Sequence, residues 1–368
     1  MKVLIINKHI SYALGGAEMQ CDLIAKGLFE RGHEVVYGAV SLPEDFKVES
    51  VYKYYICKLD LSRESTVKSF LEQHQPDIIY WRFNKHGLDK IIPPAKSLKI
   101  PFVYAVSHIN DVTRFAYKPI KSSSLIGKIK AGLNILRQKL NSAIQFSYLK
   151  EISGLTSLNS DFIGKLDVPF QKVIKNSVPD EAIPFQMKDP FVIWVSSIKA
   201  SKRPESYIEL ARSCSDLDVT FLMVGPIQQN RYEEIISKAQ ALPNFSYLGK
   251  KSPEEVNGVI KNALILVHTC EPEGFGNNFI QAWMQSCPTV SLSFDPDNII
   301  QKEGLGYVSG SQKQLEIDVR KLLEDNKLRI EMGEKAKKYA IQNFSANRLT
   351  EEVESFLKSL LDENRIHS

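Results

Sequence analysis

The sequence predicts an α/β protein with two doubly wound domains, each built around a parallel sheet. The chain has 368 residues, of which 43% are hydrophobic, and this is enough to form two separate cores. In both halves, apolar runs of strand length alternate with helix-length segments, and no hairpin signal joins the runs. Between the halves, residues 176–190 contain three prolines and few residues suited to a core. We therefore expect domains at 1–182 and 183–345.

Composition narrows the class of protein. No run of about 18 apolar residues is present, so we expect no membrane span. Residues 1–7 are typical of a strand and lack the cleavage site of a signal peptide. The five cysteines form no CxxC pair, which favours reduced thiols in the cytoplasm over a disulfide framework or a zinc site. Residues 1–180 hold 25 basic and 17 acidic residues, so we expect this half to meet an anionic surface or substrate.

The first domain is expected to begin with a strand at 2–7, a helix from about 17 to 31 and a strand at 33–40. Gly15 and Gly16 lie at the strand-to-helix turn, where backbone N–H groups and the helix dipole suit a phosphate. A double glycine alone is weak evidence for such a site. Further strands are expected at 77–81, 101–106, 152–160 and 173–176.

Four polar residues follow two of these strands. Arg82 and Asn84 come after the strand at 77–81, and His108 and Asn110 come after the strand at 101–106. Doubly wound sheets bind ligands at the carboxyl ends of their strands, so these residues are candidates for a site. The alternatives are ordinary loop polarity for Arg82 and Asn84 and a structural role for His108.

Residues 112–150 contain eight basic residues and no acidic one. Their isoleucines and leucines recur at three- and four-residue steps, which predicts an amphipathic helix. Helices with a basic polar side bind anionic membrane surfaces. The alternative is a helix packed on its own domain with a solvated cationic face, and the sequence does not choose between the two.

The second half repeats the alternation of strands and helices. Strands are expected at 191–195, 221–224, 245–248, 263–267 and 289–294, and helices at 253–261, 313–325, 329–343 and 346–362. Lys202 precedes a helix that follows the first of these strands, and Gly225 ends the second. Lys202 is equally consistent with ordinary surface charge.

Residues 271–288 are the most informative stretch. A glycine-bracketed turn over 273–276 joins the strand at 263–267 to a helix that Asn277 or Asn278 can cap. The bare N–H groups at such a helix start suit a phosphate. Glu273 lies just ahead of this position, and Gln281 lies two turns into the helix. The alternative is an ordinary tight turn.

These motifs resemble family 4 glycosyltransferases, which are retaining, nucleotide-sugar-dependent enzymes of the GT-B fold. The matches are Gly-Gly-Ala-Glu at 15–18 and Glu-Gly-Phe-Gly at 273–276. The family's second glutamate is Gln281 here, and the arginine five residues before Lys202 is Ser197. The resemblance implies that the two domains face each other across a cleft and that the last helix, within 346–368, packs back toward the first domain.

The resemblance also implies roles for the candidate residues. His108, Lys202 and Glu273 would be catalytic, and Arg82, Asn84 and Asn110 would lie on the acceptor side. The donor would be bound by Gly15, Gly16, Ser197, Gly225, Gly274, Phe275, Gly276, Asn277, Asn278 and Gln281. Gln281 would contact the ribose. No metal or other cofactor is implied, and we discount the Asp295-Pro296-Asp297 motif as a metal site.

The implied reaction transfers a sugar from a nucleoside-diphosphate donor to a saccharide. Many relatives build cell-surface polysaccharide on lipid carriers, so we expect a lipid-linked saccharide acceptor and a peripheral location on the inner membrane face. We expect no nucleic-acid partner. Two alternatives remain: a donor-binding regulatory subunit with little activity, which the departures at Gln281 and Ser197 favour, and a sugar-nucleotide epimerase.

Overall fold

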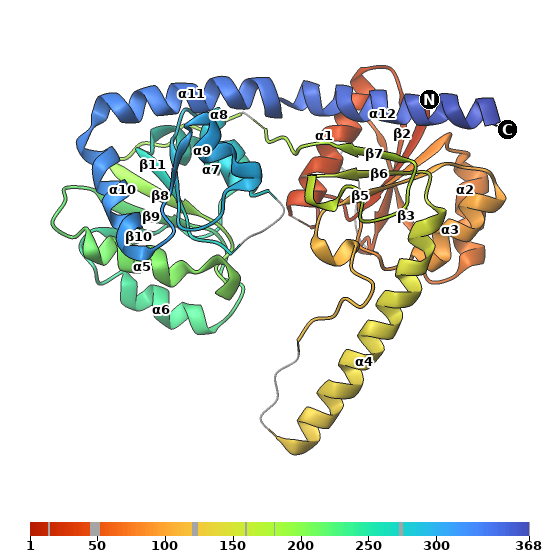
Figure 1. Ribbon diagram of the computed structural model, residues 1–368, viewed down its shortest axis with the longest axis horizontal. Helices are drawn as coiled ribbons and strands as arrows, with labels where there is room; N and C mark the ends of the chain where they lie inside the picture. The colour runs from red at the N-terminus through yellow and green to blue at the C-terminus, as the bar shows by residue number, and fades with distance from the viewer. Residues whose placement is uncertain are drawn as a thin grey trace. The chain divides into compact units, whose positions relative to one another are not determined.

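The structure is a computed structural model that describes residues 1–13, 15–44, 52–119, 124–158, 160–179, 181–271 and 275–367. The chain divides into two compact units (Figure 1). The first unit comprises Met1–Asn176 and Ala346–Ser368, and the second comprises Ser177–Ser345. Within the described residues, no helix is long and apolar enough to cross a membrane.

The first unit is built on a parallel sheet with the strand order β3-β2-β1-β4-β5-β6-β7. Its strands are β1 (Lys2–Asn7), β2 (Glu34–Val40), β3 (Tyr55–Leu59), β4 (Ile78–Trp81), β5 (Phe102–Val106), β6 (Gly154–Ser157) and β7 (Phe170–Val173). Strand β3 was not predicted from the sequence, and β7 was predicted too late in the chain, at 173–176. Asn176 lies beyond the sheet, where its side chain accepts a hydrogen bond from Arg82.

The central strand β1 shows why this sheet is covered on both faces. Successive side chains of a strand point to opposite faces, and the four residues in the middle of β1, at 3–6, are all apolar. Leu4 and Ile6 pack with α2 (Glu64–His74) and α3 (Leu88–Ser97). Val3 and Ile5 pack with α1 (Gly16–Glu30) and α12 (Ala346–His367) on the other face. The remaining long helix of this unit, α4 (Leu125–Ser147), leads away from the sheet (Figure 1).

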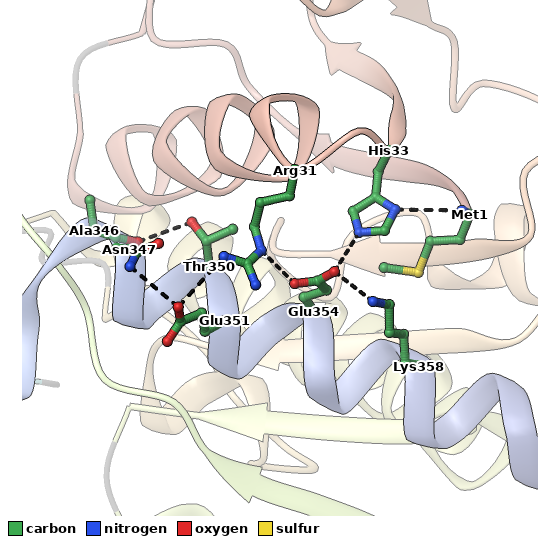
Figure 2. A network of polar contacts seen from close by, with 9 residues as sticks. All are labelled: Met1, Arg31, His33, Ala346, Asn347, Thr350, Glu351, Glu354 and Lys358. Carbon is green, nitrogen blue, oxygen red and sulfur yellow. Dashed lines mark hydrogen bonds and ion pairs between the residues drawn. The ribbon is translucent and has the colours of Figure 1, made fainter.

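Polar contacts at one residue help to fix α12 on the first unit. The Glu354 carboxylate accepts hydrogen bonds from Arg31 Nε at 2.5 Å and Lys358 Nζ at 2.7 Å (Figure 2). His33 Nε2 lies 2.8 Å from the same carboxylate. These hydrogen bonds, with Lys358 the largest contribution, lower the pKa of Glu354 to about 2. Although α12 comes last in the chain, it therefore belongs to the first unit.

The second unit has a parallel sheet with the order β10-β9-β8-β11-β12-β13. Its strands are β8 (Phe191–Val195), β9 (Thr220–Val224), β10 (Phe245–Tyr247), β11 (Ile265–His268), β12 (Thr289–Ser291) and β13 (Gly306–Val308). Its helices are α5 (Pro204–Ser213), α6 (Arg231–Ala239), α7 (Pro253–Asn262), α8 (Asn277–Met284), α9 (Ile299–Glu303), α10 (Gln312–Glu324) and α11 (Asn326–Phe344). Strand β13 was not predicted from the sequence.

The structure places the unit boundary at 176/177, before the predicted 182/183. Residues 177–185 belong to the second unit because they are bound along α7. Ile183 N–H donates to the Glu254 carbonyl at 3.0 Å. A Cβ on Gly258 would lie 1.7 Å from the Ile183 carbonyl oxygen, so only glycine allows this approach. The proline-containing linker therefore follows the end of the first unit and is itself bound to the second unit.

Candidate active site

The start of α8 forms the centre of the candidate site in the second unit. Gly276 precedes the helix with a φ of 82°, a left-handed conformation that favours glycine. The helix is anchored by its buried aromatic face. The Phe279 ring lies 4.3 Å from the His268 ring at the end of β11 and 5.7 Å from the Trp283 ring. This packing holds the first N–H groups of α8 beside the carboxyl ends of the strands, where they can bind an anion.

Asn278 connects the start of α8 to the neighbouring strand. Its Nδ2 group donates to the Val195 carbonyl, at the end of β8, at 3.0 Å. Its Oδ1 atom is buried and has no hydrogen-bond partner among the described residues. A buried acceptor without a partner is costly in a folded protein. The atom is therefore available to accept a hydrogen bond from a ligand hydroxyl or amide.

Lys202 lies on a short loop that is fixed against the same edge of the sheet. Thr269 Oγ1 donates to the Lys202 carbonyl at 2.8 Å and accepts from Trp194 Nε1 at 2.9 Å. Glu271 N–H donates to the Ser201 carbonyl at 2.9 Å. These bonds fasten the loop after β8 to the residues that lead toward α8. Lys202 is partly exposed.

Gly225 and Ser197 lie where β9 and β8 end. Gly225 has a φ of 141°, and a Cβ there would lie 1.8 Å from the Ser196 carbonyl oxygen. Only glycine lets the two strand ends approach so closely. Gly225 therefore shapes this edge of the sheet through its backbone, beside the partly buried Ser197.

The structure gives Gln281 a partner inside the protein. Its side chain is 8% exposed, and Nε2 donates to Asn257 Oδ1 at 3.0 Å. Asn257 is fully buried, and its Nδ2 donates to the carbonyls of Pro179 at 2.7 Å and Glu181 at 2.8 Å. Because one of the two amide N–H groups of Gln281 already serves this network, the predicted contact with a ribose stays a prediction for the amide oxygen or the second N–H group.

Two residues of the central stretch, Glu273 and Gly274, lie outside the described residues, so their predicted roles stay predictions. Phe275 is 1% exposed, and its ring lies 5.2 Å from that of Phe344. Its side chain therefore belongs to the core, and the predicted donor contact of Phe275 stays a prediction for its backbone. Gly276 and Asn277 are partly buried at the start of α8.

The Asp295-Pro296-Asp297 motif, which we discounted as a metal site, has a structural role at Asp295. Both carboxylate oxygens of Asp295 accept backbone hydrogen bonds, from Ile300 N–H at 2.8 Å and from Gln301 N–H at 3.2 Å. These donors lie in the first turn of α9, whose N–H groups need acceptors. The carboxylate therefore caps a helix.

In the first unit, Gly15 and Gly16 lie at the start of α1 as predicted. A Cβ on Gly15 would come within 2.3 Å of Glu18 Oε2, so the glycine makes room for this carboxylate. Burial raises the pKa of Glu18, and the positive charges of Lys8 and Arg82 oppose this shift. Lys8 follows β1 and Arg82 follows β4, so both lie at the carboxyl edge of the sheet.

Arg82 and Asn84 differ in their availability. Arg82 is 4% exposed and donates to Asn176 Oδ1 at 2.6 Å, whereas its buried Nε has no hydrogen-bond partner among the described residues. Asn84 is exposed, and its side chain accepts from His86 N–H at 2.8 Å within its own turn. Arg82 is thus the stronger candidate for binding a ligand, and Asn84 shapes the loop.

His108 begins a short 3-10 helix over Ile109–Asp111 and is held in one tautomer. Its Nδ1 accepts from Asn110 N–H at 3.1 Å, so the neutral ring carries its proton on Nε2. Asp111 Oδ2 accepts from Ser107 N–H at 3.0 Å and from His108 N–H at 2.9 Å. Burial raises the pKa of Asp111. The exposed His108 ring therefore presents an N–H donor, and Asn110 contacts this ring through its backbone N–H.

The sequence analysis missed a buried histidine near the glycine turn. His9 is fully buried, with Nε2 at 2.8 Å from Tyr54 Oη and Nδ1 at 2.6 Å from Ser11 Oγ. Burial lowers its pKa to about 4, so the ring is neutral. Its carbonyl accepts from the N–H groups of Tyr12 and Ala13, which fixes the loop leading to Gly15. A histidine two residues after the first strand was the available signal.

Comparisons with known proteins agree with this geometry. Residues 179–339, which contain α8, the Lys202 loop and the Gln281 network, match the family model described as glycosyl transferases group 1. These residues form a group 1 glycosyl transferase domain. The chain therefore contains a glycosyl transferase domain, as predicted, whereas membership of family 4 and retention of configuration stay predictions.

More distant relatives cover nearly the whole chain. N-acetyl-alpha-D-glucosaminyl L-malate synthase of Bacillus anthracis is 20% identical over 379 residues, covering 96% of each chain. The crystal structure of Anabaena Alr3699/HepE in complex with UDP and glucose has a TM-score of 0.72 at 16% identity, covering 98% of this chain and 100% of that one. Sucrose-phosphate synthase from Thermosynechococcus elongatus has a TM-score of 0.74 at 12% identity, covering 98% and 99%. The predicted GT-B fold of this glycosyltransferase is thereby confirmed.

Proposed function

We propose that this protein is a retaining, family 4 glycosyltransferase that moves a sugar from a nucleoside-diphosphate donor to a saccharide acceptor. The observation that carries the proposal is the start of α8 beside the Lys202 loop. The start of α8, with the positive end of its helix dipole, suits a diphosphate, and the buried, unpartnered Oδ1 of Asn278 suits a ligand donor such as a sugar hydroxyl. The complex of Alr3699/HepE with UDP and glucose supports this class of donor.

The roles of the residues follow from the charge that develops during transfer. As the glycosidic bond breaks, the diphosphate gains negative charge. Preorganised donors stabilise such charge by several kcal/mol, and here Lys202 and the N–H groups of α8 would supply them. The Nε2–H group of His108 would donate to the transferred sugar, and Glu273 would bind its hydroxyls. The donor phosphate itself would take the acceptor proton on the same face, so no metal and no protein nucleophile are needed.

The proposed acceptor is a lipid-linked saccharide of cell-surface polysaccharide synthesis. The enzyme would meet it peripherally, at the inner face of an anionic membrane. The excess of basic over acidic residues in the first half of the chain supports this location. The buried guanidinium of Arg82, with an unpartnered Nε, is a candidate contact for an anionic or hydroxyl-rich acceptor.

A second candidate function is a donor-binding subunit with little activity of its own. The hydrogen bond from Gln281 to Asn257 favours it, because one of the two amide N–H groups of Gln281 is engaged within the protein and cannot bind the donor. Incubation of the purified protein with a panel of nucleotide sugars and candidate lipid-linked acceptors separates the two. The proposed enzyme releases nucleoside diphosphate and yields a glycoside with the anomeric configuration of the donor. Inversion of configuration would contradict the proposal, and donor binding without turnover would favour the second candidate.

A further inference from the structure

Helix α4 turns its apolar side chains away from the unit to which it belongs. Figure 1 shows the helix leading away from the sheet of the first unit. Five large apolar side chains follow one another at three- and four-residue steps and are 54–65% exposed. This apolar stripe consists of Ile129, Leu133, Leu136, Leu140 and Ile144. Residues at such steps share one face of a helix, so the stripe is continuous.

The opposite face of α4 is held to the unit by hydrogen bonds. Ser142 Oγ accepts from Lys85 Nζ at 2.9 Å and from Ala116 N–H at 3.1 Å. Gln145 Nε2 donates to Asp89 Oδ1 at 2.8 Å. The polar side of the helix therefore faces its own protein, and the apolar side faces outward. This arrangement argues against a helix that simply packs its apolar stripe on its own domain.

Cationic side chains lie along both edges of the apolar stripe. Lys128 and Lys139 are three helical turns apart on one edge, and Lys130 and Arg137 are two turns apart on the other. Residues 112–150 contain no carboxylate that could neutralise them. Long basic side chains at the border of an apolar face place their charges at the level of lipid phosphates while the apolar face meets acyl chains.

A cavity of about 320 Å³ continues the stripe where α4 joins the unit. Its lining combines three cations and one carboxylate with apolar side chains: Arg114, Ala143, Phe146, Ser147, Leu149, Lys150, Lys165, Leu166 and Asp167. Ala143 and Ser147 follow Leu136 and Leu140 at helical spacing, so the stripe leads directly to this cavity. An anionic lipid matches both surfaces, because its head group suits the cations of the cavity and its apolar chains suit the stripe.

We propose that α4 is a membrane-docking helix that binds an anionic phospholipid leaflet. The apolar stripe enters the boundary of the acyl chains, and the flanking cations and the cavity at its base bind lipid phosphates. The inference deepens the location given under the proposed function, on which it rests for the lipid-linked acceptor. The docking itself needs no sugar donor. A second copy of the chain is a poorer occupant because the basic edges of two such helices repel each other.

Vesicle flotation of the full chain tests this inference. Vesicles of phosphatidylglycerol and phosphatidylcholine in equal parts are compared with phosphatidylcholine alone, at low and high salt. We expect the protein to float with the anionic vesicles only, and less so at high salt. Leu133→Ser combined with Leu140→Ser, and separately glutamine at the four flanking cations, should each lower the partition coefficient by about tenfold or more.

Matched controls make the result specific to α4. Glutamine at four exposed cations of the second unit, Lys261, Lys302, Lys313 and Lys327, removes the same charge and should leave flotation nearly unchanged. Unchanged thermal unfolding of all variants would show that folding is intact. Wild-type protein that ignores anionic vesicles at low salt, or a stripe variant that floats like wild type, would overturn the inference.

Two further outcomes distinguish membrane docking from dimerisation and from donor binding. Concentration-dependent dimers that the stripe variant abolishes, without vesicle binding, would make a second copy the occupant and overturn membrane docking. Wild-type protein that binds anionic vesicles but no nucleotide sugar would contradict the proposed function and still support α4 as a membrane-docking helix.

Discussion

Gln281→Glu restores the glutamate of the family that the sequence resembles. We nevertheless expect this substitution to lower the stability of the protein. In Gln281→Glu, the group that donates to Asn257 Oδ1 becomes a carboxylate that can only accept. Rotation of the Asn257 amide does not help, because its Nδ2 group would then leave the carbonyls of Pro179 and Glu181. Two buried acceptors would face each other, at a cost of about 1–3 kcal/mol in the free energy of unfolding.

Thermal unfolding at several pH values measures this cost. For a unit of this size, 1 kcal/mol lowers the melting temperature by about 2–4 °C. The buried carboxyl should have a pKa above its unfolded value of about 4.3, because burial disfavours the charge. The destabilisation should therefore be complete above the folded-state pKa. It should shrink as the pH falls below it, because a protonated carboxyl can again donate to Asn257.

Gln281→Met is the matched control. It removes the same hydrogen bond without adding a charge, so its smaller loss of stability, about 1 kcal/mol, should not depend on the ionisation of residue 281. A Gln281→Glu variant as stable as wild type at neutral pH would refute the reasoning. A deficit equal at all pH values would also contradict it, because the predicted cause is a charge.

Three other perturbations test the site and the fold. Lys202→Ala and Glu273→Gln should each reduce turnover at least about tenfold, equivalent to about 1.4 kcal/mol of barrier, whereas Lys199→Ala should not; wild-type turnover in both site variants would remove these residues from the site. EDTA should leave turnover unchanged. A loss of turnover that magnesium or manganese restores would contradict this prediction, because it would mean that a metal ion binds the diphosphate. Glu354→Gln should lower the free energy of unfolding by about 1–2 kcal/mol at neutral pH. Because the pKa of Glu354 is lowered to about 2, this difference should be complete above about pH 4.5 and vanish toward pH 2; a constant difference in denaturant melts would contradict the ion-pair origin.

The sequence sufficed where local pattern decides the structure. The run over β1 is apolar at successive positions, which specifies a strand buried on both faces. The glycine turn before α8 likewise specifies a strand-turn-helix unit, since the left-handed conformation at position 276 favours glycine. Short strands such as β3 carry a weaker pattern, because β3 has five residues and buries only Ile56 and Leu59.

Other features depend on partners far away in the chain. The partner of Gln281 is Asn257, whose own bonds reach the linker, and no local pattern encodes this network. The outward orientation of α4 is another example. Periodicity located its apolar stripe, but the bonds from Ser142 and Gln145 to residues on other elements decide which face is turned inward. The burial of His9 likewise requires Tyr54, which lies directly before β3.

The central claim is that the second unit binds the diphosphate of a nucleotide sugar at the start of α8 with the help of Lys202. Calorimetric titration of the full chain with a panel of nucleotide sugars, in the presence of EDTA, tests it most directly. We predict that at least one member of the panel binds and that Lys202→Ala lowers its affinity at least about tenfold, or about 1.4 kcal/mol. Binding of none of them, or equal affinity in the Lys202→Ala variant, would contradict the claim.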